Sequence, residues 1–361
     1  MYIHVPFCTS KCGYCDFYSV APNPNLIGSY TGAVCSELSR WSHLNKAADT
    51  LYFGGGTPTL LGGKNIEKII NTAKTHFGLE KAEITLEANP CGDLEEILKT
   101  AASCGVNRLS LGVQSGVSGE LKALTRRHTP EDVLNAIGTA RKAGIKNISA
   151  DIMLGIPRQT PQSLEKTLQF VTGLNIRHIS AYMLKIEPGT PFYSANISLP
   201  DENEAAELYL NTVKLLESAG FCQYEISNFA IPGFESKHNL KYWNCEEYLG
   251  IGPAAHSFIS GQRFYYERNL EKFLKSPQTI PDGEGGSPDE YAVLRLRLKD
   301  GLVFSLFRER FSRDVSERFL NQAEALEGSG LIVLDSQKIA LTPEGFLVSN
   351  RIITHLLEYG I

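Results

Sequence analysis

The 361-residue sequence has no run of about 18 uncharged apolar residues, the length needed by a transmembrane helix. Its first residues, MYIHVPFCTSKCGYC, have neither the basic start nor the apolar stretch of a secretory signal. A formal net charge of −5 shows no excess of basic residues, which would mark a protein that binds nucleic acids. We therefore expect a cytoplasmic protein with no transmembrane segment and no nucleic-acid partner.

The composition is that of an ordinary folded chain, without repeats or low-complexity segments. Hydrophobic residues make up 42% and charged residues 21%, so the chain can bury a core for one large and one smaller domain. In a cytoplasmic chain, cysteines stay reduced, and a tight group of them indicates a metal site. The eight cysteines are Cys8, Cys12, Cys15, Cys35, Cys91, Cys104, Cys222 and Cys245.

Short apolar runs alternate with amphipathic stretches through the first two thirds of the chain. This alternation predicts a parallel sheet with right-handed crossovers. Six strands favour an incomplete (β/α)6 TIM-like barrel in an α/β protein, with an open doubly wound sheet as the alternative. The expected strands are residues 2–5, 50–53, 83–87, 108–113, 147–154 and 178–184, and the expected helices are roughly 26–44, 66–77, 94–103, 130–143 and 164–171.

The last third has a different pattern. A helix is expected at 202–219, a linker rich in proline, glycine and acidic residues at 276–288, a hairpin at 331–334 and 339–341, and a helix at 343–359. We therefore predict a partial barrel at 1–200, a barrel extension and connecting region at 201–288, and a smaller α+β, winged-helix-like domain at 289–361. The charges of this last domain are nearly balanced, so we do not expect it to bind DNA.

Three cysteines have the spacing C-x3-C-x2-C: Cys8, Cys12 and Cys15. Ordinary [4Fe-4S] centres use four cysteines, but here the position two after Cys15 is Phe17. The alternative is a zinc site, but zinc sites usually combine paired C-x2-C elements or histidines, and a second pair is absent.

Three thiolates would leave one iron of a [4Fe-4S] cluster without a protein ligand. That iron can bind the amino and carboxylate groups of S-adenosylmethionine (SAM), and a reduced cluster can then cleave the C–S bond to release a 5′-deoxyadenosyl radical. The spacing thus indicates a radical SAM protein that also needs an electron donor.

Two further features suit a ligand beside this loop. The string GGGTPT, from Gly54 to Thr59, follows the second strand. Its glycines have no side chains, so the backbone of this string can come close to a ligand. The string lacks the lysine of a phosphate-binding P-loop, and a plain turn is the alternative. Glu87, Gln114 and Asp151 lie at or near the ends of successive strands, where barrels collect their ligands. Arg126 could bind a carboxylate or could be a surface arginine.

The strings YIHVPFCTSKCGYCDF, GGGTPT, EANP, GVQS and EPGTP resemble the oxygen-independent coproporphyrinogen III oxidase family of radical SAM proteins, and within it most closely the HemW-type heme chaperones. The resemblance implies contacts of Tyr2, Gly55 and Glu87 with the cluster-bound SAM. It also implies a pocket for a second SAM formed by Tyr14, Gly56, Thr57, Gln114, Arg126 and Asp151. The chain departs from the family pattern at Gly116, where an aromatic residue is common, and at Thr125, where glycine is usual.

The string HNLKYW places His238 beside Tyr242 and Trp243. An imidazole can ligate heme iron, and aromatic rings can stack on a porphyrin, whereas a packed polar turn is the alternative from the residues alone. The string matches the HNxxYW motif of HemW-type chaperones, which implies heme binding by these three residues. His256 is a second candidate ligand. The GIGPAA string at 250–255 contains a proline and lacks the acidic residue of an NAD site.

Three functions compete. The resemblance to HemW implies a chaperone that binds heme and passes it to an unidentified acceptor protein. The alternative is the oxidase, which decarboxylates coproporphyrinogen III to protoporphyrinogen IX, but Phe17 replaces a further cysteine of the oxidase pattern, and the sequence begins directly at the first strand without the oxidase's N-terminal arm. The third is a radical SAM enzyme with another substrate. SAM cleavage is possible in each case, and the oxidase activity is doubtful.

Overall fold

The computed structural model describes residues 1–358 and 360–361. Its centre is a curved sheet of nine strands in the order β7-β8-β6-β5-β4-β3-β2-β1-β9. Six neighbouring strands are parallel: β1 (Tyr2–Val5), β2 (Thr50–Gly55), β3 (Glu83–Ala88), β4 (Arg108–Gln114), β5 (Asn147–Leu154) and β6 (His178–Met183). The six expected strands are therefore present.

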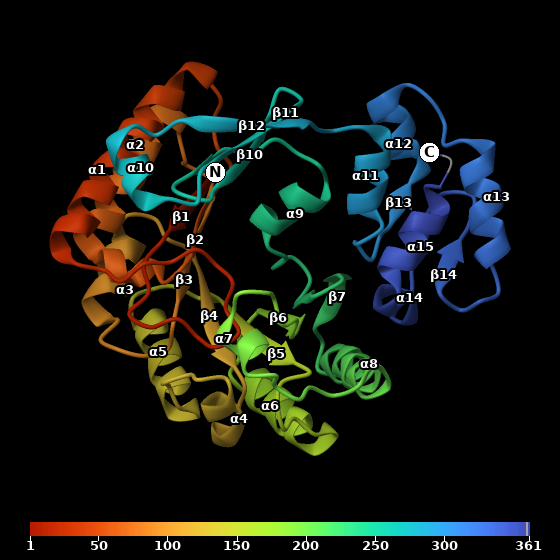
Figure 1. The fold of residues 1–361 in the computed structure, drawn as a ribbon, viewed down its shortest axis with the longest axis horizontal. Helices are drawn as coiled ribbons and strands as arrows, with labels where there is room; N and C mark the ends of the chain where they lie inside the picture. Colours follow the sequence, from red (N-terminus) through yellow and green to blue (C-terminus); the bar gives the residue numbers. More distant parts are fainter. Residues whose placement is uncertain (359) are drawn as a thin grey trace.

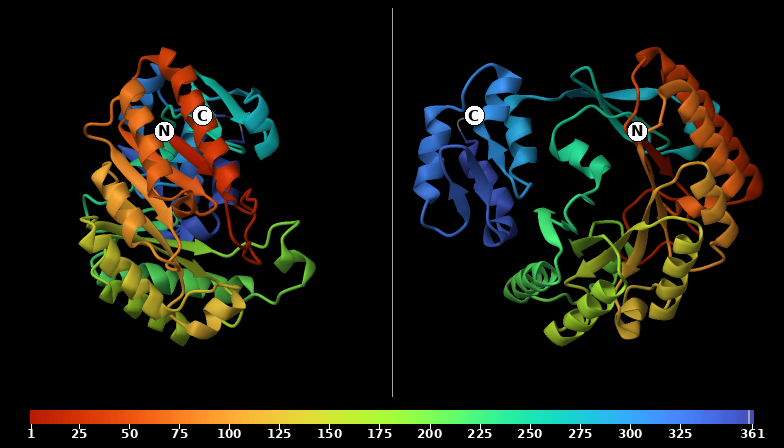
Figure 2. Two further views of the ribbon diagram at one scale, coloured as in Figure 1. Left: turned by 90° about the vertical axis from the view of Figure 1, so that its left-hand side faces the viewer. Right: turned by 180° about the vertical axis from the view of Figure 1, so that it is seen from behind.

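The helices between these strands lie on one side of the sheet, around the outside of the arc (Figures 1 and 2). A doubly wound sheet would have helices on both faces and a reversal of strand order, so the partial barrel is confirmed. The helices are α1 (Pro24–Arg40), α2 (Gly63–Phe77), α3 (Glu95–Ser103), α4 (Ser118–Ala123), α5 (Pro130–Lys142) and α6 (Pro161–Gly173), with short 3-10 turns η1 (Trp41–Leu44) and η2 (Pro58–Leu61).

Local sequence explains where these helices begin. Thr129 caps α5 through a capping box with Asp132, and Pro130 occupies the first turn. Thr160 and Ser163 form the same arrangement at the start of α6. Such caps satisfy backbone N–H groups that have no partner within the helix.

Side chains alternate between two environments along the parallel strands. Apolar residues such as Leu51, Phe53, Leu109 and Leu111 are 0% exposed and form the core beneath the helices. The residues between them face the inside of the barrel and are mainly polar; on β4 they are Arg108, Ser110 and Gln114. A polar interior requires hydrogen-bond partners, and it therefore suits a polar ligand.

Beyond β6, the chain adds α7 (Pro191–Ser194), α8 (Glu202–Ser218), the antiparallel strands β7 (Cys222–Glu225) and β8 (Asn228–Ala230), α9 (Lys237–Trp243) and β9 (Gly250–Ile251). β9 pairs with β1. A second sheet follows, formed by β10 (His256–Ile259), β11 (Gln262–Tyr266) and β12 (Thr279–Glu284), with α10 (Leu270–Lys275) between the last two.

The prediction of a linker at 276–288 was wrong for its central part. Strand β12 pairs antiparallel with β11, and its Pro281 and acidic residues gave it the composition of a loop. Because β12 is an edge strand with an exposed surface, proline and charges are tolerated there.

The smaller C-terminal domain combines helices with a three-stranded antiparallel sheet in the order β13-β15-β14. Its elements are α11 (Pro288–Arg295), β13 (Leu302–Val303), α12 (Phe304–Phe311), α13 (Glu317–Leu326), β14 (Ile332–Leu334), β15 (Lys338–Leu341), α14 (Pro343–Leu347) and α15 (Ser349–Leu356). The expected hairpin is therefore present. The helix expected at 343–359 is two helices, because the backbone leaves the helical conformation at Val348; residue 359 lies outside the described residues.

Within the described part of the chain, no helix is both long and apolar enough to span a membrane. The boundaries expected at residues 200 and 288 stay predictions.

Candidate functional site

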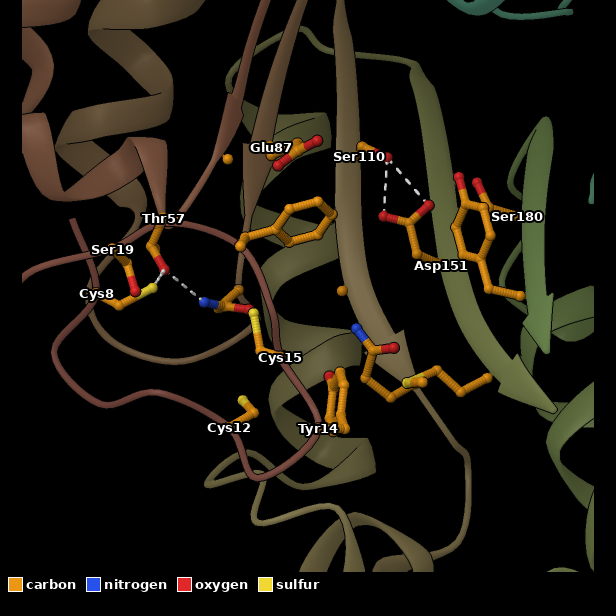
Figure 3. Close-up of a pocket in the computed structure, with 18 of the residues that line it drawn as sticks. Cys8, Cys12, Tyr14, Cys15, Ser19, Thr57, Glu87, Ser110, Asp151 and Ser180 are labelled. Atoms are coloured by element: carbon orange, nitrogen blue, oxygen red, sulfur yellow. Dashed lines mark hydrogen bonds between the residues drawn. The ribbon is translucent and has the colours of Figure 1, made fainter. Parts of the chain in front are cut away.

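A cavity of about 440 Å³ lies inside the partial barrel. The loop that follows β1 closes one side of it with Cys8, Cys12 and Cys15, and the polar faces of β2 to β6 form its wall (Figure 3). Eight residues predicted to bind SAM line this cavity together with the cysteines: Tyr14, Gly55, Gly56, Thr57, Glu87, Gln114, Arg126 and Asp151. Tyr2 is the one member of the predicted SAM set that does not line it.

The loop that carries the three cysteines is held at several points. The Cys8 N–H donates to Val20 O (3.1 Å), and the Gly13 carbonyl accepts from the Phe192 N–H (2.9 Å). A Cβ atom on Gly13 would lie 2.3 Å from the Phe192 ring, so only glycine fits there. These contacts fix the loop over the end of the barrel.

The three thiols are free and partly exposed. The Cys8 Sγ lies 3.5 Å from Thr57 Oγ1, and Arg126 Nη1 donates to Cys12 Sγ (3.5 Å). Burial raises the pKa of Cys15, and the neighbouring thiols Cys12 and Cys8 raise it further. The guanidinium of Arg126 lies against the Cys12 sulfur.

These residues fit an iron–sulfur cluster in number and chemistry: soft thiol ligands on one loop, beside a cation. Within residues 1–358 and 360–361, no three histidine, cysteine or acidic side chains converge closely enough to hold a single metal ion. A [4Fe-4S] cluster does not need such convergence, because each thiolate binds a different iron.

The glycines at the end of β2 are required by packing. Gly55 has φ +105°, which disfavours other residues, and a Cβ atom there would lie 2.7 Å from the His4 ring. A Cβ atom on Gly56 would lie 2.5 Å from the Phe7 carbonyl oxygen. The glycine string thus lets its backbone run against β1 and the start of the cysteine loop, which places Thr57 next to Cys8.

Two carboxylates lie on the inner wall, and each has its own donors. Glu87 Oε1 accepts from the Tyr52 hydroxyl (2.8 Å), and Asp151 accepts from Ser110 (3.0 and 3.1 Å). Burial raises the pKa of Glu87 to about 7, and Asp151 contributes to this shift. Burial also raises the pKa of Asp151, against hydrogen bonds from Ser180 and Ser110 that lower it. The cavity thus presents one carboxyl group, that of Glu87, which changes charge near neutral pH.

Arg126 is an inner residue of the site and not a surface arginine. Its Nη2 donates to Asn89 Oδ1 (2.5 Å) and to the Gly112 carbonyl (3.0 Å). Gln114 beside it has φ 63°, a conformation that is uncommon for residues other than glycine. Strained conformations often mark functional sites, and here the strain directs the β4 terminus into the cavity.

Comparisons with known proteins agree with this geometry. The sequence pattern of the radical SAM superfamily matches residues 2–171, and that of the HemN C-terminal domain matches residues 288–348. The chain is 33% identical to the heme chaperone HemW of Lactococcus lactis, over 99% of this chain and 96% of the relative. It is 34% identical to the heme chaperone HemW of Bacillus subtilis, over 97% of each.

The chain belongs to the HemW family. Its fold is also that of the coproporphyrinogen III oxidase HemN from Escherichia coli, with a TM-score of 0.85 over 99% of this chain and 89% of that one, at 22% sequence identity. That likeness concerns the fold alone.

The structure explains the two departures of this HemW-family chain. A Cβ atom on Gly116 would lie 3.0 Å from Phe170 Cβ, so Phe170 of α6 occupies the space that an aromatic residue at 116 would need. Thr125 has φ 58°, and its Oγ1 accepts from the Gly13 N–H (2.9 Å). The threonine thereby adds an attachment point for the cysteine loop that glycine could not supply.

The HNxxYW motif of this HemW-family chain forms α9, outside the part of the cavity that holds the cysteines. His238 is 1% exposed, and its ring nitrogens lie 2.8 Å from Thr50 Oγ1 and 2.8 Å from the Tyr242 hydroxyl. Its ring stacks on Tyr52 (5.1 Å between centroids) and on Tyr2 (6.3 Å). Burial lowers the pKa of His238 well below its usual value, so the imidazole is neutral.

In this conformation, neither ring nitrogen of His238 is free to ligate iron. Tyr2 packs against this histidine and does not line the cavity. Trp243 ends α9 and is partly buried. His256 is exposed and lies 3.6 Å from Asp282, on the small second sheet.

Several cavity residues were not identified from the sequence: Tyr52, Asn89, Arg108, Ser110, Ser180, Tyr182, Met183 and Asn239. One signal was available for some of them. Polar residues alternate with apolar ones in RLSLGVQ of β4 and HISAYM of β6, although parallel strands buried on both faces are usually apolar throughout.

Proposed function

We propose that this HemW-family protein is a heme chaperone that holds a [4Fe-4S] cluster on Cys8, Cys12 and Cys15 and binds SAM in the adjoining cavity. The observation that carries the proposal is the common location of three free thiols, Arg126 and the Glu87 and Asp151 carboxyls around one cavity. Two relatives that match nearly the whole chain are heme chaperones. The proposal includes an electron donor for the cluster and a separate protein that accepts the heme.

The residues of this chain would bind and orient. When bound, a cluster and SAM supply one-electron cleavage of the SAM C–S bond, and the protein provides position and charge. In this proposal, Glu87 accepts a hydrogen bond from SAM, and the bond from the Tyr52 hydroxyl, which supports this role, orients the carboxyl. Arg126 links the cysteine loop to β4 and keeps a positive charge beside Cys12.

We also propose His238 as the side chain that ligates the heme iron. His238 can ligate heme iron through Nε2 after its contact with the Tyr242 hydroxyl is broken, with Tyr242 and Trp243 shielding the macrocycle. The Tyr242→Phe variant separates this role from a structural one. If Nε2 ligates iron, this variant frees the nitrogen, so heme should bind at least as tightly with an unchanged ligand spectrum, whereas His238→Ala should shift the Soret band or lose heme.

The function is tested by heme transfer. The anaerobically reconstituted protein should bind heme in a titration followed at the Soret band, and an apo-cytochrome should then take up that heme at a rate that rises with the acceptor concentration. A rate that does not depend on the acceptor would mean passive release of heme and would contradict a chaperone. Where one of the three cluster cysteines is replaced by alanine, the matched control is Cys222→Ala, at an exposed cysteine away from the cavity.

A further inference from the structure

An unpaired arginine lies at the end of the cavity opposite the cysteines. Arg108 is the first residue of β4 and Gln114 the last, and both line the cavity. At roughly 3.3 Å per residue, the two ends of this strand are about 20 Å apart. Asn239 of α9 lines the cavity as well, so the HNxxYW helix contributes to its wall.

The guanidinium of Arg108 has no hydrogen-bond or ion-pair partner among the residues that the structure describes. Its residue is 1% exposed, and its Nε is a buried donor without an acceptor. A buried charge without a partner is strongly unfavourable, and an unsatisfied group of this kind calls for an ion, a water or a ligand.

A second unpaired group lies beside it. Thr85 on β3 is the register partner of Arg108, so the two side chains lie on the same face of the sheet. Thr85 is 0% exposed, and its Oγ1 also lacks a partner among the described residues. The guanidinium that lines the cavity therefore has a buried hydroxyl on the neighbouring strand, and both groups can donate to an anion.

The nearby acids do not satisfy this arginine. Glu87 accepts from Tyr52, Asp151 from Ser110, and Glu83 from the His238 N–H (3.3 Å). Arg108 lowers the pKa of all three at longer range. These carboxyls would repel an anion with two charges more strongly than one with a single charge. A planar anion with one charge matches the guanidinium fork best.

We propose that Arg108, with Thr85 beside it, binds a carboxylate group of the molecule that occupies the cavity. Under the proposed function, two molecules carry a carboxylate that is not bound to the cluster iron: heme through its propionates and a second SAM through its methionyl group. The assignment of either source rests on that function, whereas the carboxylate site itself does not.

The test uses the cluster-loaded full chain under anaerobic conditions. Sodium propionate should raise the melting temperature of the wild-type protein above that in sodium chloride of equal ionic strength, and Arg108→Met should remove this rise. Loss of a charge-assisted bond predicts an affinity that falls about tenfold to a hundredfold. Replacing a buried unpaired cation by an apolar chain is often neutral or stabilising, so the ligand-free variant should melt no lower than the wild type. Arg127→Met, at the exposed neighbour of Arg126, is the control and should leave the propionate effect unchanged.

Two further arms identify the source of the carboxylate. Heme and heme dimethyl ester are titrated into both proteins: a preference for free heme that Arg108→Met abolishes assigns the site to a propionate. A weakened affinity for a second SAM in the same variant, with the first still bound at the cluster, assigns it to that second SAM. If Arg108→Met does not fold, Thr85→Val replaces it, with a smaller loss expected.

The inference is overturned if propionate, heme and SAM bind the variant and the wild type equally. A protein that binds no heme at all contradicts the proposed function instead, and the propionate arm still decides the carboxylate site.

Discussion

Glu87 provides a sharp test of the site, because the structure gives it both a role and a titration. Burial raises the pKa of its carboxyl to about 7, from the ordinary 4.5. As an acceptor for SAM, Glu87 is needed in its ionised form. That form makes up about a tenth of the protein at pH 6 and about nine tenths at pH 8.

The affinity for SAM should therefore rise about tenfold between pH 6 and pH 8 in the wild type. Glu87→Gln keeps the shape and can still accept from the Tyr52 hydroxyl, but it has no charge at any pH. At pH 8, it should bind SAM about tenfold to a hundredfold more weakly than the wild type. At pH 6, this difference should be about tenfold smaller, between almost none and about tenfold.

The assay is equilibrium dialysis of radiolabelled SAM against the cluster-loaded protein at pH 6, 7 and 8. Glu96→Gln, at a side chain that is 81% exposed, controls for the loss of a surface charge. The reasoning is refuted if the wild type and Glu87→Gln show the same pH dependence, or if they differ as much at pH 6 as at pH 8.

Four further predictions follow from the same contacts. Between pH 4.5 and pH 7, Glu87 keeps its proton in the folded protein but loses it in the unfolded chain. The free energy of unfolding should therefore fall by up to about 3 kcal/mol as the pH rises through this range. Glu87→Gln should remove this pH dependence when unfolding is measured in urea. Alanine at Cys8, Cys12 or Cys15 should abolish loading of iron and sulfide, whereas alanine at Cys35, Cys91, Cys104, Cys222 or Cys245 should not; a requirement for one of these five would contradict the three-ligand assignment. Thr125→Val leaves the Gly13 N–H without its acceptor and should lower the stability by about 1–3 kcal/mol. Thr125→Ser keeps the hydroxyl and should keep most of the wild-type stability. Equal stability of the two variants would argue against the bond. Gly116→Ala should destabilise the protein by about 1–3 kcal/mol through contact with Phe170. The double variant Gly116→Ala, Phe170→Ala should lose less stability than the sum of the losses of the two single variants. A double variant that loses the full sum would mean that the two residues do not compete for space.

The strands and most helices could be predicted from the sequence, because local patterns determine them. Apolar and polar residues alternate in β4, and Thr129 and Pro130 mark the start of α5. The cysteine spacing likewise predicted a loop with three thiols close together. Because the ends of parallel strands meet at one edge of the barrel, Glu87, Gln114 and Asp151 could be expected around the same cavity.

Other features depend on contacts between distant parts of the chain. The residues of HNLKYW by themselves favour a packed polar turn, and His238 is indeed buried. Its partner Thr50, which is 188 residues away, could not be read from the string. The role of Thr125 depends on Gly13, 112 residues away. Strand β12 looked like a linker, because an exposed edge strand and a loop have similar compositions.

The cavity interior was identified only in part from the sequence. Arg108 lies at the start of its strand and not at the end where ligands were expected. Its importance became visible only when the structure showed its burial and its lack of a partner.

The most direct test of the central claim compares heme with coproporphyrinogen III on one preparation. The cluster-loaded protein is incubated anaerobically with SAM, a reductant and coproporphyrinogen III, and a parallel sample with heme is passed through gel filtration. A heme chaperone should retain heme through the column and form no protoporphyrinogen IX. Repeated turnover of coproporphyrinogen III with consumption of SAM, and no retained heme, would contradict the account and identify the chain as an oxidase.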